Sequence, residues 1–278
     1  MSLIGSLTSG VSAMSSFSTD LNVIGNNIAN VNTVGFKDSK ANFADSFSNT
    51  LHGNVQIGIG VQVSGVTQNF TQGALSTTGV PSDLGISGNG FFVVSNPVDS
   101  QQYVTRAGNF SVDSSGYLTT SQGYRVQGLT GGTSSAAPSS VGDIKLGTPP
   151  TGTQLQSYAI DTKGDLIESY SDGTSATTNQ VLLQSFTNPT MLVKQGGNLF
   201  SNASAAGPIG GATLSAANNS PGGNGLGALQ SGMLELSNVD LTAQMADMIT
   251  AQRSFQAASR VITVSDSVLE EIVNLKRS

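Results

Sequence analysis

The sequence predicts an α+β fold, in which long N- and C-terminal helices pack as a coiled-coil-like domain and a mainly antiparallel β domain forms the middle. Three observations support this prediction. Apolar residues recur at alternating steps of four and three through the first 31 residues and again through the last 45, which is the spacing of a helical seam. Between these ends, short alternating runs are separated by turn residues, the pattern of strands joined in hairpins.

The N-terminal segment is predicted to form a helix with one apolar seam. The seam positions are Leu3, Leu7, Gly10, Met14, Phe17, Leu21, Ile24, Ile28 and Val31. The other faces carry Ser, Thr, Asn and Gly, and Asp20 is the only charged residue before Lys37. These residue types are poor helix formers, and helices draw most of their stability from packing. We therefore expect this helix to become ordered on assembly with other copies.

The C-terminal segment repeats the same spacing with better helix formers. Its positions are Leu241, Met245, Met248, Gln252, Phe255, Ser259, Ile262, Asp266, Leu269 and Val273. We expect the two seams to pack together and to provide a self-assembly interface. The residues predicted for that interface are Leu7, Met14, Phe17, Leu21, Ile24, Ile28, Val31, Leu241, Met245, Met248, Phe255, Ile262, Leu269 and Val273.

A simpler interpretation of these two segments is an intramolecular helical hairpin that caps a β domain. Such a hairpin is expected to cover its outward faces with charge. The outward faces here, especially those of the first helix, are small, polar and nearly uncharged. Faces of this kind can pack against copies of themselves without desolvating an ion. This favours the self-assembly interpretation.

The middle of the chain is predicted to be rich in β-structure. Residues 57–63 alternate Ile and Val with Gly and Gln, a period of two. Hairpins are predicted at 91–106, at 109–120 and at 158–170. Two Gly- and Ser-rich stretches, 130–140 and 201–225, are predicted to be linkers. The predicted domains are a discontinuous helical domain at 1–36 and 230–278, an extended or β linker region at 37–72, and a β-rich domain at 73–229.

Composition argues against several classes of protein. The formal net charge of −6 argues against nucleic-acid binding, which needs clustered positive charge. Cysteine is absent, so the chain has neither a disulfide framework nor a thiolate metal site. The longest strongly apolar run, at 90–94, is too short to cross a bilayer. We expect no cofactor, no metal and no membrane insertion.

Three motifs that could carry chemistry have structural interpretations that fit better. The glycines of GISGNGFF (85–92) lack the spacing of a dinucleotide fingerprint and precede a predicted strand, whereas a phosphate cradle needs a helix there. The stretch 161–172 has Lys163 at the third ligand position of a calcium loop, its glycine at the fourth rather than the sixth position, and no Glu at the twelfth. His52 is the only histidine, and no nucleophile elbow accompanies it. The carboxylates are scattered, and the sequence does not give their separation. We expect no enzymatic activity.

Several segments resemble the bacterial flagellar axial proteins, the family of hook and rod subunits. The resemblance lies in NVIGNNIANVNTVGFK (22–37), GALSTTGVPSDLGISGNGFFVV (73–94), YVTRAGNFSVDSSGYLTTSQGYRVQG (103–128) and SNVDLTAQMADMITAQRSFQAASRVITVSDSVLEEIVNLKR (237–277). It implies a subunit that the flagellar type III apparatus exports unfolded. It also implies that the terminal helices form the inner tube of a hollow homopolymer and the β domain its outer wall. The implied neighbours are other axial proteins: rod, hook cap and hook–filament junction.

The resemblance is compatible with two kinds of flagellar subunit. The C-terminal segment is most similar to the hook protein, so the preferred function is a short hook subunit that transmits torque while bending. The alternative is the distal rod protein, because the outer β domain that many hook proteins insert is missing here. A secreted β-rich adhesin or hydrolase with oligomerising ends is a third, less favoured class. The implied location is the hook or basal body, outside the cell after export.

Overall fold

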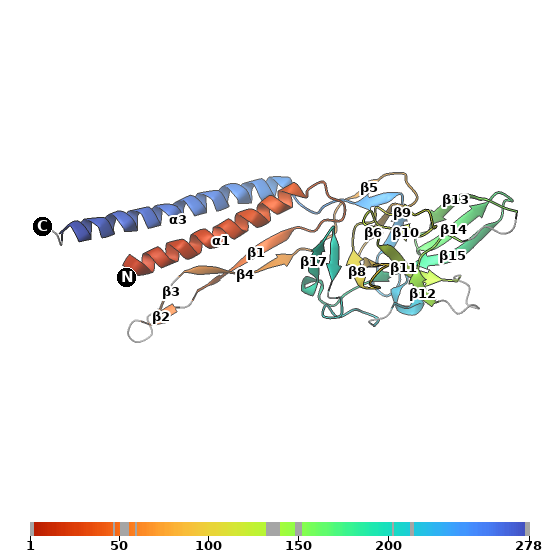
Figure 1. The fold of residues 1–278 in the computed structure, drawn as a ribbon, viewed down its shortest axis with the longest axis horizontal. Coiled ribbons are helices and arrows are strands. Elements are labelled where there is room, and N and C mark those ends of the chain that lie inside the picture. The colour runs from red at the N-terminus through yellow and green to blue at the C-terminus, as the bar shows by residue number, and fades with distance from the viewer. Residues whose placement is uncertain are drawn as a thin grey trace. The chain divides into compact units, whose positions relative to one another are not determined.

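The protein divides into two compact units in the computed structural model, which describes residues 3–46, 48–50, 56–58, 60–131, 140–147, 152–201, 203–211 and 214–275. We call residues 1–31, 37–69 and 239–278 the helical unit, and residues 32–36 and 70–238 the β unit. Terminal helices and antiparallel strands between them confirm the predicted α+β fold (Figure 1). This division differs from the predicted domains, because it groups residues 37–69 with the helices.

Two long antiparallel helices dominate the helical unit. Helix α1 (Leu3–Ala29) lies beside α3 (Leu241–Leu275), and a two-stranded ribbon of β1 (Ser39–Asp45) and β4 (Val61–Gln68) packs along α1 (Figure 1). A second short antiparallel pair consists of β2 (Ser48–Thr50) and β3 (Gln56–Gly58). Of the alternation predicted at 57–63, residues 57–58 fall in β3 and 61–63 in β4, whereas Ile59 lies outside the described residues. A two-stranded ribbon is marginal alone, so its packing on α1 supports both elements.

The β unit is built on one large sheet whose main path runs β13-β14-β15-β11-β7-β8-β18-β17. These strands are β7 (Phe91–Ser95), β8 (Gln102–Thr105), β11 (Arg125–Thr130), β13 (Leu155–Ile160), β14 (Asp165–Tyr170), β15 (Ser175–Val181), β17 (Val193–Gly196) and β18 (Leu199–Ser201). The strands attached to this path are β9 (Ser111–Val112), β10 (Leu118–Thr119), β12 (Ser140–Asp143) and β16 (Leu183–Gln184). The predicted hairpins are confirmed as β7–β8, β9–β10 and β13–β14.

Two smaller strand pairs and two short helical turns complete the described part of the β unit. The strand pairs are β5 (Leu75–Thr77) with β20 (Met233–Glu235), and β6 (Leu84–Ser87) with β19 (Ala228–Ser231). The helical turns are η1 (Pro189–Met191) and α2 (Ala216–Asn219). Strands from the beginning and from the end of the β unit's sequence therefore pair with each other.

Strand β7 explains where the core of the β unit lies. Its four residues from Phe91 to Val94 are all buried, and they alternate between two apolar clusters. Phe92 packs edge-on against Phe110 in one cluster, whereas Phe91 packs edge-on against Phe186 in the other. A strand covered on both faces needs an uninterrupted apolar run, and FFVV provides one.

The prediction of a linker at 201–225 is wrong, because described parts of this segment are buried in the β unit. The Asn219 side chain is fully buried, and its amide donates to the Leu183 carbonyl at 2.9 Å and to Gln184 Oε1 at 2.8 Å. Buried polar side chains are normally hydrogen-bonded, and Asn219 is such a core residue. Because Asn is also common in linkers, its residue type alone suggested a loop. The other predicted linker, 130–140, falls mostly outside the described residues.

A buried ion pair lies inside the β unit. Arg106 Nη1 lies 3.2 Å from Glu235 Oε2, and the two side chains are 3% and 0% exposed. The guanidinium also lies 5.1 Å from the centre of the Phe91 ring, a cation–π distance. Burial lowers the pKa of Arg106, and the charge of Glu235 opposes that shift. A charge buried this deeply depends on its partner.

Glu235 also binds two backbone segments that are distant in sequence. Its Oε1 accepts the Gly73 N–H at 2.9 Å, and its backbone carbonyl accepts the Gly35 N–H at 2.8 Å. Gly35 has φ +67°, and a Cβ there would lie 2.5 Å from the Ala107 nitrogen. Only glycine suits this conformation and approach. Through its side chain and its backbone, Glu235 therefore joins strand β20 to the 32–36 segment, the chain before β5 and the residue that follows β8.

Replacing Glu235 by glutamine tests the importance of this ion pair. Glu235→Gln leaves Arg106 buried without a counter-charge, and we expect a loss of about 3–5 kcal/mol in the free energy of unfolding of the β unit. The measurement is urea unfolding followed by circular dichroism. Asp143→Asn is the matched control, because Asp143 pairs with Arg125 at 2.9 Å but both side chains are about 30% exposed. The control is expected to cost about 1 kcal/mol or less, and equal losses would contradict the prediction.

Candidate assembly surface

Helices α1 and α3 contact each other along most of their length through pairs of small or polar residues. Ser6 Oγ and Ser265 Oγ lie 3.2 Å apart near one end, and Asn27 Nδ2 donates to Gln244 Oε1 at 3.0 Å near the other. These pairs confirm that the helices are antiparallel. Between them, a Cβ added to Gly10 would lie 2.9 Å from Ile262 Cγ1. Gly10 is thus required for the observed separation of the helices.

The face of α3 that packs on α1 alternates large and small residues at four-three spacing. Small residues Ala251, Ala258 and Ser265 are buried at seven-residue intervals. Large residues at the intervening positions, Met248, Phe255, Ile262 and Leu269, are half-buried. Small side chains let helix axes approach closely, and the large residues then fill the space on either side.

A second face of α1 packs on the β1–β4 ribbon through hydrogen bonds to its backbone. Ser16 Oγ donates to the Val61 carbonyl at 3.1 Å, and Ser12 Oγ accepts the Val61 N–H at 3.3 Å. Asn27 binds both backbone groups of Ser39, at 2.7 and 3.0 Å. The Ser and Asn residues that weaken α1 as an isolated helix therefore hold the ribbon to it.

The helical unit has almost no hydrophobic core of its own. Among the described residues, its buried hydrophobic side chains are Ile24, Ala41, Ala251 and Ala258, whereas the β unit has all the others. Alanine contributes little apolar area to a core, and small cores give marginal stability. A core this small predicts that the helical unit is only marginally stable by itself.

The structure brings together some of the residues predicted for the self-assembly interface and separates others. Ile24 is buried, and Leu7, Met14, Phe17, Leu21, Ile28, Val31, Met248, Phe255, Ile262 and Leu269 are half-buried. Leu241, Met245 and Val273 are exposed, at 39%, 50% and 56%. The sequence analysis missed the small residues of α3 and the side chains that bind the ribbon. For the small residues of α3, the sequence pattern that could have revealed them is the seven-residue recurrence of Ala251, Ala258 and Ser265.

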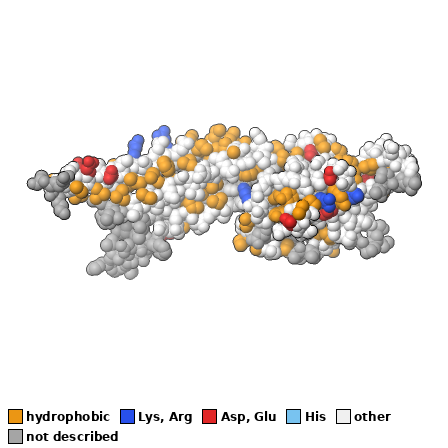
Figure 2. Space-filling view, viewed as in Figure 1, with side chains coloured by type: hydrophobic (Ala, Val, Ile, Leu, Met, Phe, Trp, Pro, Cys, Tyr) orange, Lys and Arg blue, Asp and Glu red, His pale blue; other side chains and the backbone are white. Residues whose placement is uncertain are grey.

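Hydrophobic side chains extend along the outer surface of the helices. Figure 2 shows them over much of the visible helical surface, with few charged side chains among them. On α1 the exposed positions include one hydrophobic residue, Val11, and the uncharged polar residues Thr8, Ser15, Ser18 and Asn22. On α3 the exposed large residues include Val261, Val264, Val268 and Ile272. Exposed apolar surface of this extent is typical of an interaction site.

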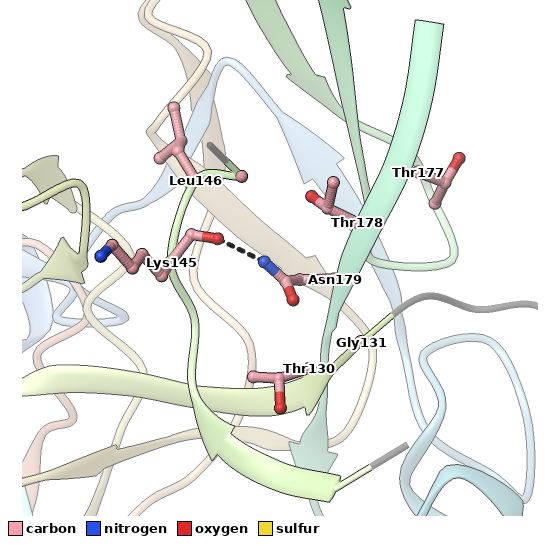
Figure 3. Close-up of a pocket in the computed structure, with 8 residues that line it drawn as sticks. Thr130, Gly131, Lys145, Leu146, Thr177, Thr178 and Asn179 are labelled. Atoms are coloured by element: carbon pink, nitrogen blue, oxygen red, sulfur yellow. Dashed lines mark hydrogen bonds between the residues drawn. The ribbon is translucent and has the colours of Figure 1, made fainter. Parts of the chain in front are cut away.

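The β unit contains an open hollow of about 450 Å³ between β11, β15 and the 145–147 segment (Figure 3). Asn179 Nδ2 donates to the Lys145 backbone carbonyl, while the Lys145 amine points away from Asn179 (Figure 3). The residues that line this hollow are Thr130, Gly131, Lys145, Leu146, Gly147, Thr177, Thr178 and Asn179. This set contains neither a carboxylate nor a histidine, so it offers no general acid or base of that kind.

A carboxylate close to this hollow is already fully engaged. Glu168 is completely buried, and it accepts hydrogen bonds from the Gly147 N–H at 2.6 Å, Thr178 Oγ1 at 3.0 Å and the Tyr170 hydroxyl at 2.6 Å. The bond to Glu168 raises the pKa of Tyr170 to about 12, because it stabilises the protonated phenol. A carboxylate held by three donors is a structural group of the core.

A charged cluster lines a second hollow in the helical unit, where α1, β1 and α3 meet. Burial raises the pKa of Asp20, the nearby charge of Asp247 raises it further, and Lys40 opposes both effects. Among the described residues, no group of three or more His, Cys, Asp or Glu side chains is arranged to hold a metal ion. The cluster is therefore a local electrostatic feature of the helix contact.

The three motifs weighed for chemistry have these outcomes. In 85–92, Gly88 and Gly90 have φ values of +117° and +134°, and the loop joins β6 to β7 rather than leading into a helix. The stretch 161–172 contains the β13–β14 turn, in which Gly164 has φ +83°. His52 lies outside the described residues. Among the helices described, none is both long and apolar enough to span a membrane.

Comparison with known proteins gives matches at both ends and in the middle of the chain. The family models that match are "Flagella basal body rod protein" at residues 7–37, "Flagellar hook protein FlgE/F/G D1 domain" at 85–167 and "Flagellar basal body rod FlgEFG protein C-terminal" at 230–275. The flagellar basal-body rod protein FlgG of Bacillus subtilis is 42% identical over 99% of this chain and 100% of its own length. The chain belongs to the flagellar hook and rod protein family.

Other relatives extend the comparison within the flagellar family. FlgG of Caulobacter vibrioides is 34% identical over 97% of this chain and 98% of its own length. The flagellar hook protein FlgE of Borreliella burgdorferi is 26% identical over 99% of this chain and 100% of its own length, in an alignment of 450 residues. The chain is thus a structural subunit of the flagellar axis, located in the region of basal body and hook.

Exchanging glycine for alanine at two positions of α1 tests the close helix contact. Gly10→Ala gains helix propensity but pushes Ile262 outward, and we expect a net loss of about 1–3 kcal/mol in the free energy of unfolding of the helical unit. Gly25→Ala is the control, because no atom lies within 4 Å of a Cβ added there. It is expected to gain up to about 1 kcal/mol. Urea unfolding of assembled particles, in which the helices are expected to be ordered, followed by circular dichroism measures both, and equal gains would contradict the close contact.

Proposed function

We propose that the chain is the repeating subunit of the distal rod of the flagellar basal body. The observation that carries this proposal is the end-to-end match with basal-body rod proteins of nearly the same length, covering 99% of the chain and 100% of the Bacillus subtilis protein. The alignment with the Borreliella burgdorferi hook protein runs over 450 residues, far beyond the 278 of this chain. That hook protein therefore has segments with no counterpart here.

This proposal reverses the preference for the hook that the C-terminal sequence suggested. The family model that matches residues 230–275 is named for FlgE, FlgF and FlgG together, so the C-terminal helix does not distinguish hook from rod. The hook protein of Helicobacter mustelae is also 42% identical, but only over 45% of this chain. The length of the chain between its shared ends is the more discriminating feature.

The proposed action of the chain is mechanical rather than chemical. Copies pack through the helical unit, which lacks a sufficient core alone, and the β unit with its own core forms the surrounding wall. The nearly uncharged faces of α1 can be buried between copies without desolvating ions. Head-to-tail contacts that do not close into a ring produce a helical filament. Such a filament can transmit torque along the flagellar axis.

The proposal includes partners beyond other copies of the chain. We infer that the neighbours along the axis are other axial proteins of rod and hook, and that the flagellar type III apparatus exports the chain. The sequence contains no cysteine, so no disulfide opposes unfolding before export. The small core of the helical unit also favours unfolding.

Immunogold labelling of isolated hook–basal bodies tests the assignment to the rod. The particles come from cells whose own gene for this chain has been deleted and then restored on a plasmid. We expect gold to lie on the rod, between the rings and the base of the hook. Gold along the curved hook would overturn the assignment in favour of the hook protein. Antibody absorbed with the purified chain is the control, and it must leave the particles unlabelled.

A further inference from the structure

Residues 32–36, which we call the strap, lie in the β unit although they connect two elements of the helical unit. The chain leaves the helical unit after residue 31, continues through the strap and re-enters the helical unit at residue 37. The two ends of the strap therefore lead to helix α1 and to strand β1. The way in which the strap is held determines how firmly both elements are linked to the β unit.

A tight turn gives the strap its shape. The Phe36 N–H donates to the Thr33 carbonyl at 3.3 Å, and Gly35, the third residue of this turn, has φ +67°. A type II turn requires positive φ at its third residue, and glycine adopts it without strain. The turn directs the Gly35 N–H to the Glu235 carbonyl, at 2.8 Å. A backbone hydrogen bond thus connects the turn of the strap to strand β20.

The turn between β17 and β18 holds the strap through a side chain. Asn198 Nδ2 donates to the Val34 carbonyl at 2.7 Å. Asn198 itself has φ +60°, a conformation that asparagine tolerates better than most residues. Its backbone carbonyl accepts a hydrogen bond from Thr105 Oγ1 at 2.8 Å, which holds the turn against the end of strand β8. Asn198 thus combines the backbone conformation that the turn needs with the amide that reaches the strap.

The large apolar side chain of the strap lies outside the core of the β unit. Phe36 is buried, but it is in neither of the two apolar clusters of the described residues. Lys194 Nζ, from strand β17, lies 4.4 Å from the centre of the Phe36 ring, a cation–π distance. Strand β17 is the last strand on the main path of the sheet. The strap therefore docks beside an end of the sheet, and both clusters form without it.

We propose that the strap docks and releases while the β unit stays folded, and that Asn198 is the positioning residue that keeps it docked. Its side chains lie outside both apolar clusters, so its release leaves the core intact, as in other local openings. Released, the five residues form a loose link of up to about 17 Å. Docked, they form a short and stiff link. The docked state then transmits force, a step that rests on the mechanical action proposed above.

Substitutions of Asn198 separate the strap from the turn that holds it. Asn198→Gly keeps a residue suited to positive φ but removes the amide that donates to Val34. Asn198→Asp keeps the shape of the side chain and loses the same donor. Because one hydrogen bond is lost, we expect the Gly35 amide to exchange about three- to tenfold faster in both variants. Hydrogen exchange of the purified full-length chain, followed by NMR at single residues, measures this rate.

Asn224→Gly is the matched control. Asn224 also has positive φ, +50°, and its amide donates to the Ala217 carbonyl at 2.7 Å, outside the strap. We expect this control to leave the exchange of Gly35 unchanged, and the amides of β7 to stay equally protected in the natural chain and all three variants. Equal acceleration of Gly35 by Asn224→Gly would overturn the proposal. So would a Gly35 amide that exchanges as slowly as β7 in the natural chain, because the strap would then open only with the whole unit.

Swimming in a viscous medium tests the mechanical role of the strap. Cells that carry each variant are compared at equal numbers of hook–basal bodies per cell. We expect Asn198→Gly cells to swim more slowly than cells with the natural chain, and Asn224→Gly cells to match them. Normal swimming of Asn198→Gly cells would overturn the mechanical role. Gold on the hook would change the assignment to the rod and leave the exchange of Gly35 as expected, so the two failures are distinguishable.

Discussion

The close approach of α1 and α3 holds the helical unit together, and it depends on small side chains at their contact. Gly10 accepts Ile262, while Ala251, Ala258 and Ser265 form the buried half of the α3 face. Because the buried side chains at this contact are small, the described part of the helical unit has very little buried apolar surface. Helices with so little core draw stability from further packing. The small core of this unit therefore supports the proposal that it assembles with other copies.

The β unit follows a different principle, because it has two apolar clusters and a buried ion pair of its own. Arg106 and Glu235 connect segments that stand far apart in the sequence, and Gly35 allows the turn at 32–36 to join them. These three residues fall in the three regions that the family models match. Parts of all three matched regions therefore meet around this ion pair inside the β unit.

The sequence predicted the fold class, both terminal helices and three hairpins, because periodicity and turn residues carry those signals. It did not predict which face of α3 meets α1, since two heptad frames one residue apart share Met248, Phe255, Ile262 and Leu269. Burial of Ala and Ser at the remaining positions distinguishes the frames, and hydrophobicity alone does not. The segment 201–225 was assigned as a linker because a buried, hydrogen-bonded Asn219 looks like a loop residue in composition.

Amide hydrogen exchange in the monomer and in assembled particles tests the central claim most directly. If the helical unit depends on its neighbours, the amides of α1 and α3 exchange rapidly in the monomer and become strongly protected after assembly. Amides of the central strands β7 and β11 are expected to be protected in both states, because the β unit has its own core. Helices as well protected in the monomer as β7 would contradict the account.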